Sequence, residues 1–143
     1  MGKRTWIDSG IWSDTDDLSD MDKLLYLYLL TNEQRNLAGY YRLNMGYMSL
    51  DLGVIETRLA KMLKREQKYW IYDPDTQQIL IPKFTKYNVI KSKQQYVRLN
   101  AELNALKPCK LHKMFIKAFV EVNGIGADEL IDEKFRRIAE TIT

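Results

Sequence analysis

The sequence predicts an α+β fold in which helices predominate. Most of the chain carries apolar residues at helical spacing, which is typical of amphipathic helices that cover a core. Two short aromatic and β-branched runs, at residues 69–72 and 78–81, flank the turn sequence Asp73-Pro74-Asp75 and predict a β-hairpin. A further short strand is expected at residues 38–43. At 143 residues, the chain is long enough to bury one substantial core.

The first predicted helix begins after Ser19, a favourable N-cap residue, with Asp22 three residues further on as in a capping box. Its apolar residues follow the spacing i, i+1, i+4, i+5 and are expected in a core. They are Leu24, Leu25, Tyr28 and Leu29. A polar break over residues 31–36 ends this helix, and Gly39 leads into the short strand.

Two helices joined by a tight glycine turn are expected next. Asn44 caps the first, which ends at Gly53, and the second runs from near Ile55 to about Gln67. On a helical wheel the second helix has an apolar side and an opposite, almost purely basic side. The apolar side contains Ile55, Leu59, Met62 and Leu63. The other side contains Thr57, Arg58, Lys61, Lys64, Arg65 and Lys68.

After Tyr87 the pattern is helical throughout, and Pro108 interrupts it. Its first part carries a narrow, heptad-like seam formed by Tyr96, Leu99, Leu103 and Leu106. The order helix, strand, helix, helix, hairpin is that of a winged helix-turn-helix, here followed by a C-terminal helical extension. We therefore expect a winged-helix domain with its lead-in at residues 1–90 and a helical extension at residues 91–143.

Charge is unevenly distributed along the chain. The formal net charge is only +3, but residues 8–22 carry acids without a lysine or arginine, and the middle of the chain is basic. In a helix-turn-helix the second helix enters the major groove of DNA, with its N-terminal residues near base edges. Arginine matches guanine, and phosphates accept any lysine. The sequence therefore predicts DNA binding.

The predicted contacts are divided by position on the second helix. Base edges are assigned to Thr57, Arg58 and Lys61, and the DNA backbone to Lys64, Arg65 and Lys68. Further backbone contacts are expected from cations elsewhere in the chain, namely Arg42, Lys83, Lys86, Lys91 and Lys93. The predicted wing carries Asp73 and Asp75 at its tip, so we do not expect it to grip phosphates.

Little in the sequence suggests catalysis, a cofactor or a metal site. Cys109 and His112 are the only cysteine and histidine, and both are interpreted as packing residues; a single cysteine fits a reducing cytosol. There is no phosphate-binding glycine loop and no metal-spaced set of ligands. The acids Asp14, Asp16 and Asp17 are interpreted as solvated caps and linker charges. The apolar run at residues 24–30 is too short to cross a membrane. We expect a cytoplasmic protein that is not an enzyme.

A combination of motifs in the first part of the chain is distinctive. The motifs are Trp6-Ile7-Asp8-Ser9, Ile11-Trp12, the block 23–32 that ends Leu-Leu-Thr-Asn, Asn36-Leu37-Ala38-Gly39-Tyr40-Tyr41, and Ile81-Pro82-Lys83-Phe84-Thr85-Lys86-Tyr87. Together they resemble the amino-terminal winged-helix domain of phage replisome organisers and DnaD-like primosomal proteins. The resemblance extends from Trp6 to about Phe119.

The resemblance implies a role in starting DNA replication in Gram-positive bacteria or their phages, and so a place in the bacterial host cytosol. Family members bind DNA, self-associate and help bring the replicative helicase to an origin. The resemblance also implies apolar docking residues for a homo-oligomer in the lead-in, at Trp6, Ile7, Ile11 and Trp12. The alternative for these four is that they fold back onto the core of their own subunit. Longer members carry a further C-terminal helical domain, whereas two helical segments follow Pro108 here.

Two other functions remain open from the sequence. One is an interaction module of a primosome, in which the winged helix serves assembly; the acidic wing and the seam at residues 96–106 favour it. The other is a winged-helix transcriptional regulator, which would use the same basic helix face.

Overall fold

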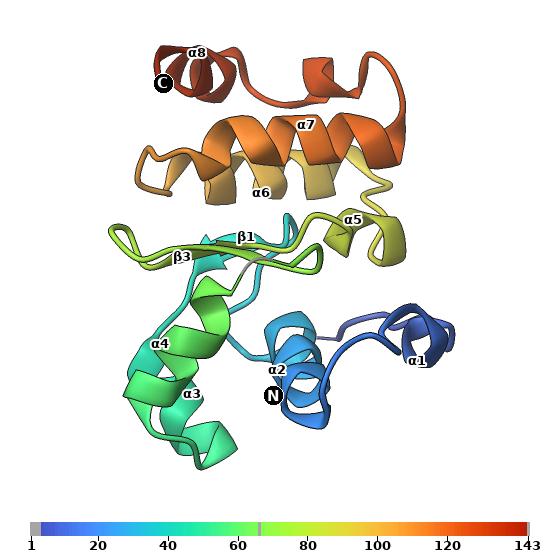
Figure 1. Ribbon diagram of the computed structural model, residues 1–143. Helices are drawn as coiled ribbons and strands as arrows, with labels where there is room; N and C mark the ends of the chain where they lie inside the picture. The colour runs from blue at the N-terminus through green and yellow to red at the C-terminus, as the bar shows by residue number, and fades with distance from the viewer. Residues whose placement is uncertain (1–3, 66, 143) are drawn as a thin grey trace.

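Two layers of helices enclose a small sheet in the computed structural model, which describes residues 4–65 and 67–142 (Figure 1). The lower layer contains α1 (Ile11–Asp14), α2 (Asp20–Thr31), α3 (Met45–Leu52) and α4 (Glu56–Lys64). The sheet contains β1 (Tyr40–Arg42), β2 (Ile71–Asp73) and β3 (Gln78–Leu80), with α5 (Phe84–Tyr87) at one end. The upper layer contains α6 (Lys93–Asn104), α7 (Leu111–Asn123), the 3₁₀ helix η1 (Ala127–Leu130) and α8 (Glu133–Thr141). The fold is α+β and mainly helical, as predicted.

Three predicted helix boundaries are confirmed. The Ser19 side chain accepts a hydrogen bond from the Asp22 N–H at 3.1 Å and caps α2. The Asn44 side chain does the same for the Tyr47 N–H at 3.0 Å and caps α3. Gly53 ends α3 in the left-handed conformation, with φ +67°. These boundaries follow from local chemistry, because each cap satisfies a backbone group that the helix leaves free.

The buried side of α2 is rotated relative to the predicted stripe. Leu25 and Leu29 are fully buried, but Leu24 is 44% exposed, so its placement in the core was wrong. Tyr26 is buried instead and packs against Tyr69, with ring centroids 5.2 Å apart. The aromatic residues that precede β2 therefore determine which side of α2 is covered.

The sheet is antiparallel, with the strand order β1-β3-β2. Side chains alternate between its two faces, so each face carries one row of opposed residues. The row that faces the lower helices consists of Tyr41, Ile79 and Tyr72. The row that faces the upper helices consists of Tyr40, Leu80 and Ile71.

The hairpin turn forms where the sequence predicts it, but Asp73 is not at its tip. Asp73 is buried at the end of β2. Its carboxylate accepts hydrogen bonds from the Thr76 N–H at 3.1 Å and from the Thr76 hydroxyl at 2.5 Å. This carboxylate stabilises the turn from inside, which leaves Asp75 as the exposed acid of the predicted pair.

The connection from α5 to α6 is irregular over residues 88–92, whereas the sequence predicted helix from residue 88 onward. A capping box formed by Ser92 and Gln95 starts α6. Leu99 and Leu103, the centre of the predicted seam, are fully buried against the sheet and the other upper helices. The seam therefore packs against other parts of the same chain, so it no longer supports the alternative in which it joins two subunits.

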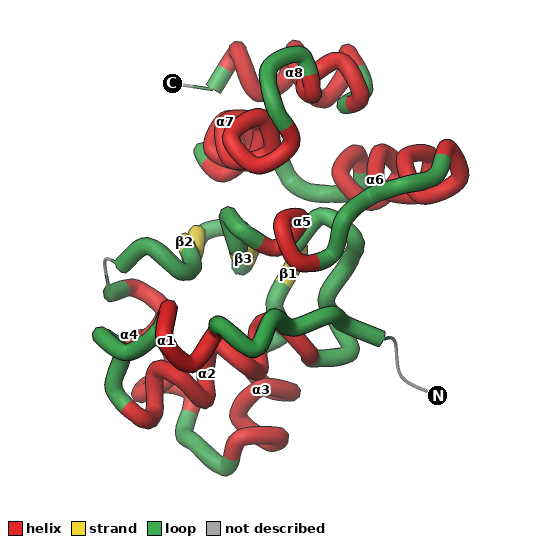
Figure 2. The backbone as a smooth tube through the Cα atoms, turned by 90° about the vertical axis from the view of Figure 1, so that its right-hand side faces the viewer, coloured by secondary structure: helices red, strands yellow, loops and turns green. Residues whose placement is uncertain are grey.

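Two hydrophobic clusters lie on opposite faces of the sheet, between it and the helices that Figure 2 shows on either side. The lower cluster joins α2, α3 and α4 to the sheet. The upper cluster draws Tyr40 and Leu80 from before residue 90 and Leu103 and Phe115 from after it. In the part of the chain described, no helix is long and apolar enough to span a bilayer.

Candidate nucleic-acid interface

Helix α4 buries one side and presents a basic side to solvent. The buried side consists of Leu59, Met62 and Leu63. The exposed side consists of Thr57, Arg58, Lys61 and Lys64. This division agrees with the helical wheel. Ile55 departs from it, being 69% exposed, because it is the N-cap and lies before the first turn of the helix.

A short, hydrogen-bonded turn holds α4 against α3. The Gly53 N–H donates to the Ser49 carbonyl at 2.9 Å, and the Ser49 hydroxyl donates to the Val54 carbonyl at 2.6 Å. Val54 and Met48 are buried below the turn. The turn therefore sets the direction in which α4 leaves the body of the protein.

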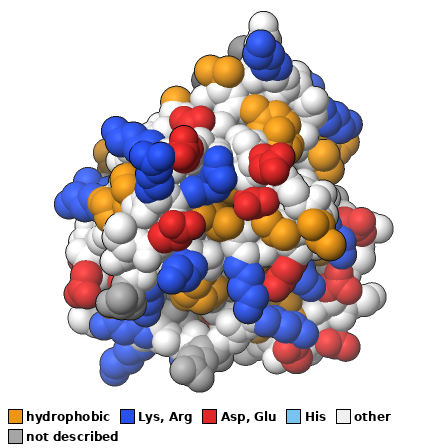
Figure 3. Space-filling view, turned by 90° about the horizontal axis from the view of Figure 1, so that it is seen from above, with side chains coloured by type: hydrophobic (Ala, Val, Ile, Leu, Met, Phe, Trp, Pro, Cys, Tyr) orange, Lys and Arg blue, Asp and Glu red, His pale blue; other side chains and the backbone are white. Residues whose placement is uncertain are grey.

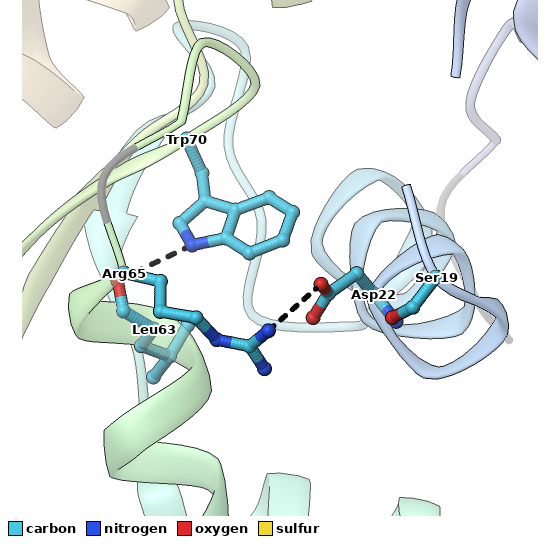
Figure 4. Close-up of polar contacts among 5 residues, drawn as sticks. All are labelled: Ser19, Asp22, Leu63, Arg65 and Trp70. Carbon is cyan, nitrogen blue, oxygen red and sulfur yellow. Dashed lines mark hydrogen bonds and ion pairs between the residues drawn. The ribbon is translucent and has the colours of Figure 1, made fainter. Parts of the chain in front are cut away.

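The helix ends at Lys64, earlier than the predicted end near Gln67. Arg65 already has an extended backbone. The indole N–H of the buried Trp70 donates to the Leu63 carbonyl at 3.3 Å (Figure 4). In a longer helix that carbonyl would accept the N–H of Gln67. Burial of Trp70 thus competes with continuation of the helix, an effect that no local pattern reveals.

Arg65 and Lys68 consequently lie beyond the helix on which they were predicted. Figure 4 shows the Arg65 side chain reaching across to α2, where Nη1 lies 3.2 Å from Asp22 Oδ2. The Lys68 Nζ lies 5.3 Å from the centroid of the Tyr69 ring. The cations on the helix itself make no ion pair with any residue that the structure describes.

A shallow groove of about 520 Å³ separates α4 from the N-terminus of α2. One wall contains the cations Arg58, Lys61 and Arg65. The other wall contains Ser19, Asp20 and Met21. Because Arg65 is paired with Asp22, the positive charge of the groove comes mainly from Arg58 and Lys61, with Asp20 as the carboxylate in the lining.

The remaining predicted cations are all exposed, but they lie at opposite ends of the sheet. Arg42 pairs with Gln78 beside the hairpin turn and donates to Gln77 Oε1 at 3.3 Å. Strand β3 runs from that turn toward α5, so the cations that follow β3 in sequence lie at the opposite end of the sheet (Figure 1). These are Lys83, Lys86, Lys91 and Lys93. The structure therefore divides the predicted backbone contacts between two surfaces.

The four lead-in residues that were predicted to mediate self-association differ in burial. Ile11 is buried in the lower cluster, so it follows the fold-back alternative. Trp6 and Trp12 are 77% and 60% exposed, and Ile7 is also exposed. The Trp6 backbone is tied to the Asn88 side chain, 82 residues away in sequence, by two hydrogen bonds. Sequence analysis missed Asn88, and no local signal marks it.

A polar cluster is buried between the sheet and the upper helices. The Tyr40 hydroxyl lies 2.6 Å from His112 Nδ1 and 3.2 Å from Cys109 Sγ. The Gln78 amide donates to the Lys107 carbonyl at 2.9 Å. Burial lowers the pKa of His112 to about 4 and raises the pKa of Tyr40. Both groups are therefore uncharged near neutral pH, in keeping with the packing role expected for His112 and Cys109.

The face above the upper helices differs from the α4 surface. Figure 3 shows basic and acidic side chains interspersed there. Arg137 and Glu133 of α8, for example, form an ion pair of 2.6 Å. Among residues 4–65 and 67–142, no group of three or more histidine, cysteine or carboxylate side chains is arranged to hold a metal ion.

Among the predicted DNA-contact residues, those on the basic side of α4 remain together on one helix, whereas the others lie on separate parts of the structure. Helix α4 combines guanidinium and ammonium groups, a neighbouring positive groove and a packed apolar side. Comparisons with protein-family models, curated proteins and solved structures find no match to this chain.

Proposed function

We propose that this protein binds duplex DNA through α4, as a winged-helix protein of the phage replisome organiser or DnaD-like kind. The observation that carries the proposal is the exposed basic side of α4 above a buried apolar side. The element order α2-β1-α3-α4-β2-β3 and the strand order β1-β3-β2 support a winged-helix arrangement. In that arrangement α4 is the recognition helix. The motif resemblance supports a role in replication initiation.

In this proposal α4 enters the major groove with its N-terminal half closest to the bases. Thr57, Arg58 and Lys61 contact base edges, and the Arg58 fork suits guanine. Lys64 and Arg65 contact phosphates. To do so, the Arg65 guanidinium must either bind a phosphate and the Asp22 carboxylate at the same time or break its ion pair with Asp22. Lys68, which follows the helix in sequence, and Arg42, on β1, add backbone contacts.

The proposed role is binding and assembly, so it requires no catalytic residue and no cofactor. The partners would be DNA, further copies of this chain and the replicative helicase or another primosome protein. The place of action would be the cytosol of the bacterial host.

Reversing two charges on α4 tests the DNA-binding surface. We expect the double variant Lys61→Glu, Lys64→Glu to bind duplex DNA on the order of tenfold more weakly or worse, because one base-edge contact is lost and one phosphate contact becomes repulsive. The log–log dependence of affinity on salt should become shallower by about 0.9, the contribution of the one phosphate contact assigned to Lys64. Fluorescence anisotropy of a labelled duplex at several salt concentrations measures both quantities.

The matched control is Lys113→Glu, Lys117→Glu, which reverses two exposed charges on α7, away from the proposed surface. This control should bind duplex DNA nearly as the unmodified chain does. Equal binding by the α4 variant and the α7 variant would contradict the proposed surface, provided that both retain the circular dichroism spectrum of the parent.

Assembly is a second candidate function, favoured by the exposed indole of Trp12 on α1. An indole exposed to this extent on a helix that also anchors Ile11 is suited to a contact between subunits. Sedimentation velocity over a range of protein concentrations should show association that Trp12→Ala weakens. A monomer at every concentration would rule this function out.

A further inference from the structure

A second groove, of about 550 Å³, lies at the end of the sheet that carries α5. The exposed lead-in forms one side of it and the α5–α6 connection forms the other. Its lining includes Trp6, Ile7, Asp8, Lys86, Tyr87 and Lys91. Lys86 and Lys91, two predicted cations that lie away from α4, thus line the groove together with the rings of Trp6 and Tyr87.

The lead-in is held in place at this groove by its backbone. The Trp6 N–H donates to Asn88 Oδ1 at 2.8 Å, and Asn88 Nδ2 donates to the Trp6 carbonyl at 3.2 Å. A further hydrogen bond holds the lead-in two residues before Trp6, where the Arg35 guanidinium donates to the Arg4 carbonyl. The Trp6 side chain nevertheless remains 77% exposed. A large aromatic ring on an anchored backbone can bind a ligand with little loss of conformational entropy.

The other side of the groove supplies positive charge next to a second aromatic ring. The Lys86 Nζ lies 5.9 Å from the centroid of the Tyr87 ring. The Lys91 N–H is bonded to Gln95 Oε1 at 2.7 Å, which fixes the Lys91 backbone while its side chain stays exposed. Asp8 is the carboxylate in the lining, and its Oδ1 already accepts the Gly10 N–H at 2.7 Å. The lining therefore carries two cations and one engaged carboxylate.

Aromatic rings beside a cationic track are the chemistry that binds single-stranded nucleic acid. The rings stack on bases, and the lysines neutralise phosphates. In a duplex the base faces are covered by neighbouring bases, so stacking on Trp6 requires an unpaired base. We propose that this groove binds an unpaired nucleotide of a single strand, with the base on Trp6 and Tyr87 and the two flanking phosphates on Lys86 and Lys91. This site is separate from the duplex-binding surface proposed for α4.

The test uses the full chain and a labelled single-stranded thymidine oligonucleotide of about 16 nucleotides. We expect Trp6→Ala to weaken binding about 5-fold or more, the usual effect of removing one stacking platform. Trp6→Phe should restore most of the affinity. The matched control is Trp12→Ala, which removes an exposed indole of the lead-in that does not line the groove. An equal loss for Trp6→Ala and Trp12→Ala would assign the effect to subunit association and overturn the proposal.

Charge reversal provides the second arm. Lys86→Glu, Lys91→Glu should make the salt dependence of oligonucleotide binding shallower by about 1.4, at about 0.7 for each phosphate on a single strand. The α7 control pair, Lys113→Glu, Lys117→Glu, should leave it unchanged. If Trp6→Ala alters sedimentation but not oligonucleotide affinity, the groove is a protein-docking surface and the proposal is wrong.

The two proposals fail separately. Groove variants should retain binding to duplex DNA, and the α4 variant should retain binding to the oligonucleotide. If the groove variants bind the oligonucleotide normally while the α4 variant loses duplex DNA, only the single-strand site is overturned. The reverse result would overturn the α4 surface and leave the groove in place.

Discussion

His112 illustrates how burial at a single residue sets a response to pH. Its ring stacks on Phe135 with centroids 4.4 Å apart, and its Nδ1 lies beside the Tyr40 hydroxyl. The side chain is almost completely buried, and desolvation penalises the charged imidazolium. The pKa of His112 is therefore lowered from 6.5 to about 4.

The lowered pKa predicts a loss of stability in mild acid. The unfolded chain protonates this histidine near pH 6.5 and the folded chain near pH 4, so the unfolded state binds more protons between these values. The stabilisation is complete above pH 6.5 and declines as the pH falls through this window. We expect urea unfolding to show a free energy about 2 kcal/mol lower at pH 5 than at pH 7.

The control for this prediction is His112→Phe, which keeps an aromatic ring against Phe135 but cannot be protonated. Its free energy of unfolding should change much less between pH 7 and pH 5. Equal stability of the unmodified chain at the two pH values would show that the histidine is not desolvated in solution.

At the level of elements, two glycines with nearly the same backbone conformation have different surroundings. Gly39, at the entrance to β1, has φ +68°, and Gly53, between α3 and α4, has φ +67°. A Cβ atom on Gly39 would overlap the Phe84 ring of α5, whereas a Cβ on Gly53 would meet nothing within 4 Å. Gly39 therefore allows β1 and α5 to approach each other, and Gly53 only allows a turn.

Alanine at these two positions should separate the conformational cost from the packing cost. Gly53→Ala should lower the free energy of unfolding by about 1 kcal/mol, the cost of a left-handed L-residue. Gly39→Ala adds an overpacking cost and should lower it by about 3 kcal/mol or more. Chemical denaturation of the two variants measures the difference, and equal losses would contradict the close packing of β1 on α5.

The elements that sequence analysis predicted correctly are those whose signals are local. The caps at Ser19 and Asn44 and the glycine turn at Gly53 each depend on a few adjacent residues. The errors arise where tertiary packing decides. Leu24 is exposed because aromatic residues near β2 pack on another side of α2, and α4 ends early because Trp70 takes the Leu63 carbonyl.

Across the whole molecule, the same distinction applies to the candidate sites. The basic side of α4 could be predicted because helical periodicity places its residues together. The second groove could not, because Trp6 meets Asn88 across 82 residues of sequence. The buried contact of Tyr40 with His112 spans 72 residues and was equally invisible. Only the folded chain shows that one sheet carries a hydrophobic cluster on each face.

This shared sheet predicts that the two clusters unfold together, although the sequence suggested a boundary near residue 90. Trp70 lies in the lower cluster and Leu103 in the upper one, and both are buried. In a Trp6→Phe, Trp12→Phe background, Trp70 is the sole indole and reports on the lower cluster. Leu103→Ala should destabilise the whole chain by about 2–5 kcal/mol. Trp70 fluorescence and far-ultraviolet circular dichroism should then give one coincident urea transition.

The control for cooperative unfolding is Val97→Ala, on the exposed side of the same helix α6. Because no buried contact is lost, its transition should stay within about 0.5 kcal/mol of the parent. If Leu103→Ala shifts the dichroism transition while the Trp70 transition stays in place, the upper helices unfold independently. In that case the sheet and the lower cluster would stay folded after the upper helices had left Tyr40 and Leu80 exposed to water. The free-energy cost of exposing these two side chains would then have to be small. That outcome is unexpected, because Tyr40 and Leu80 are both buried against the upper helices.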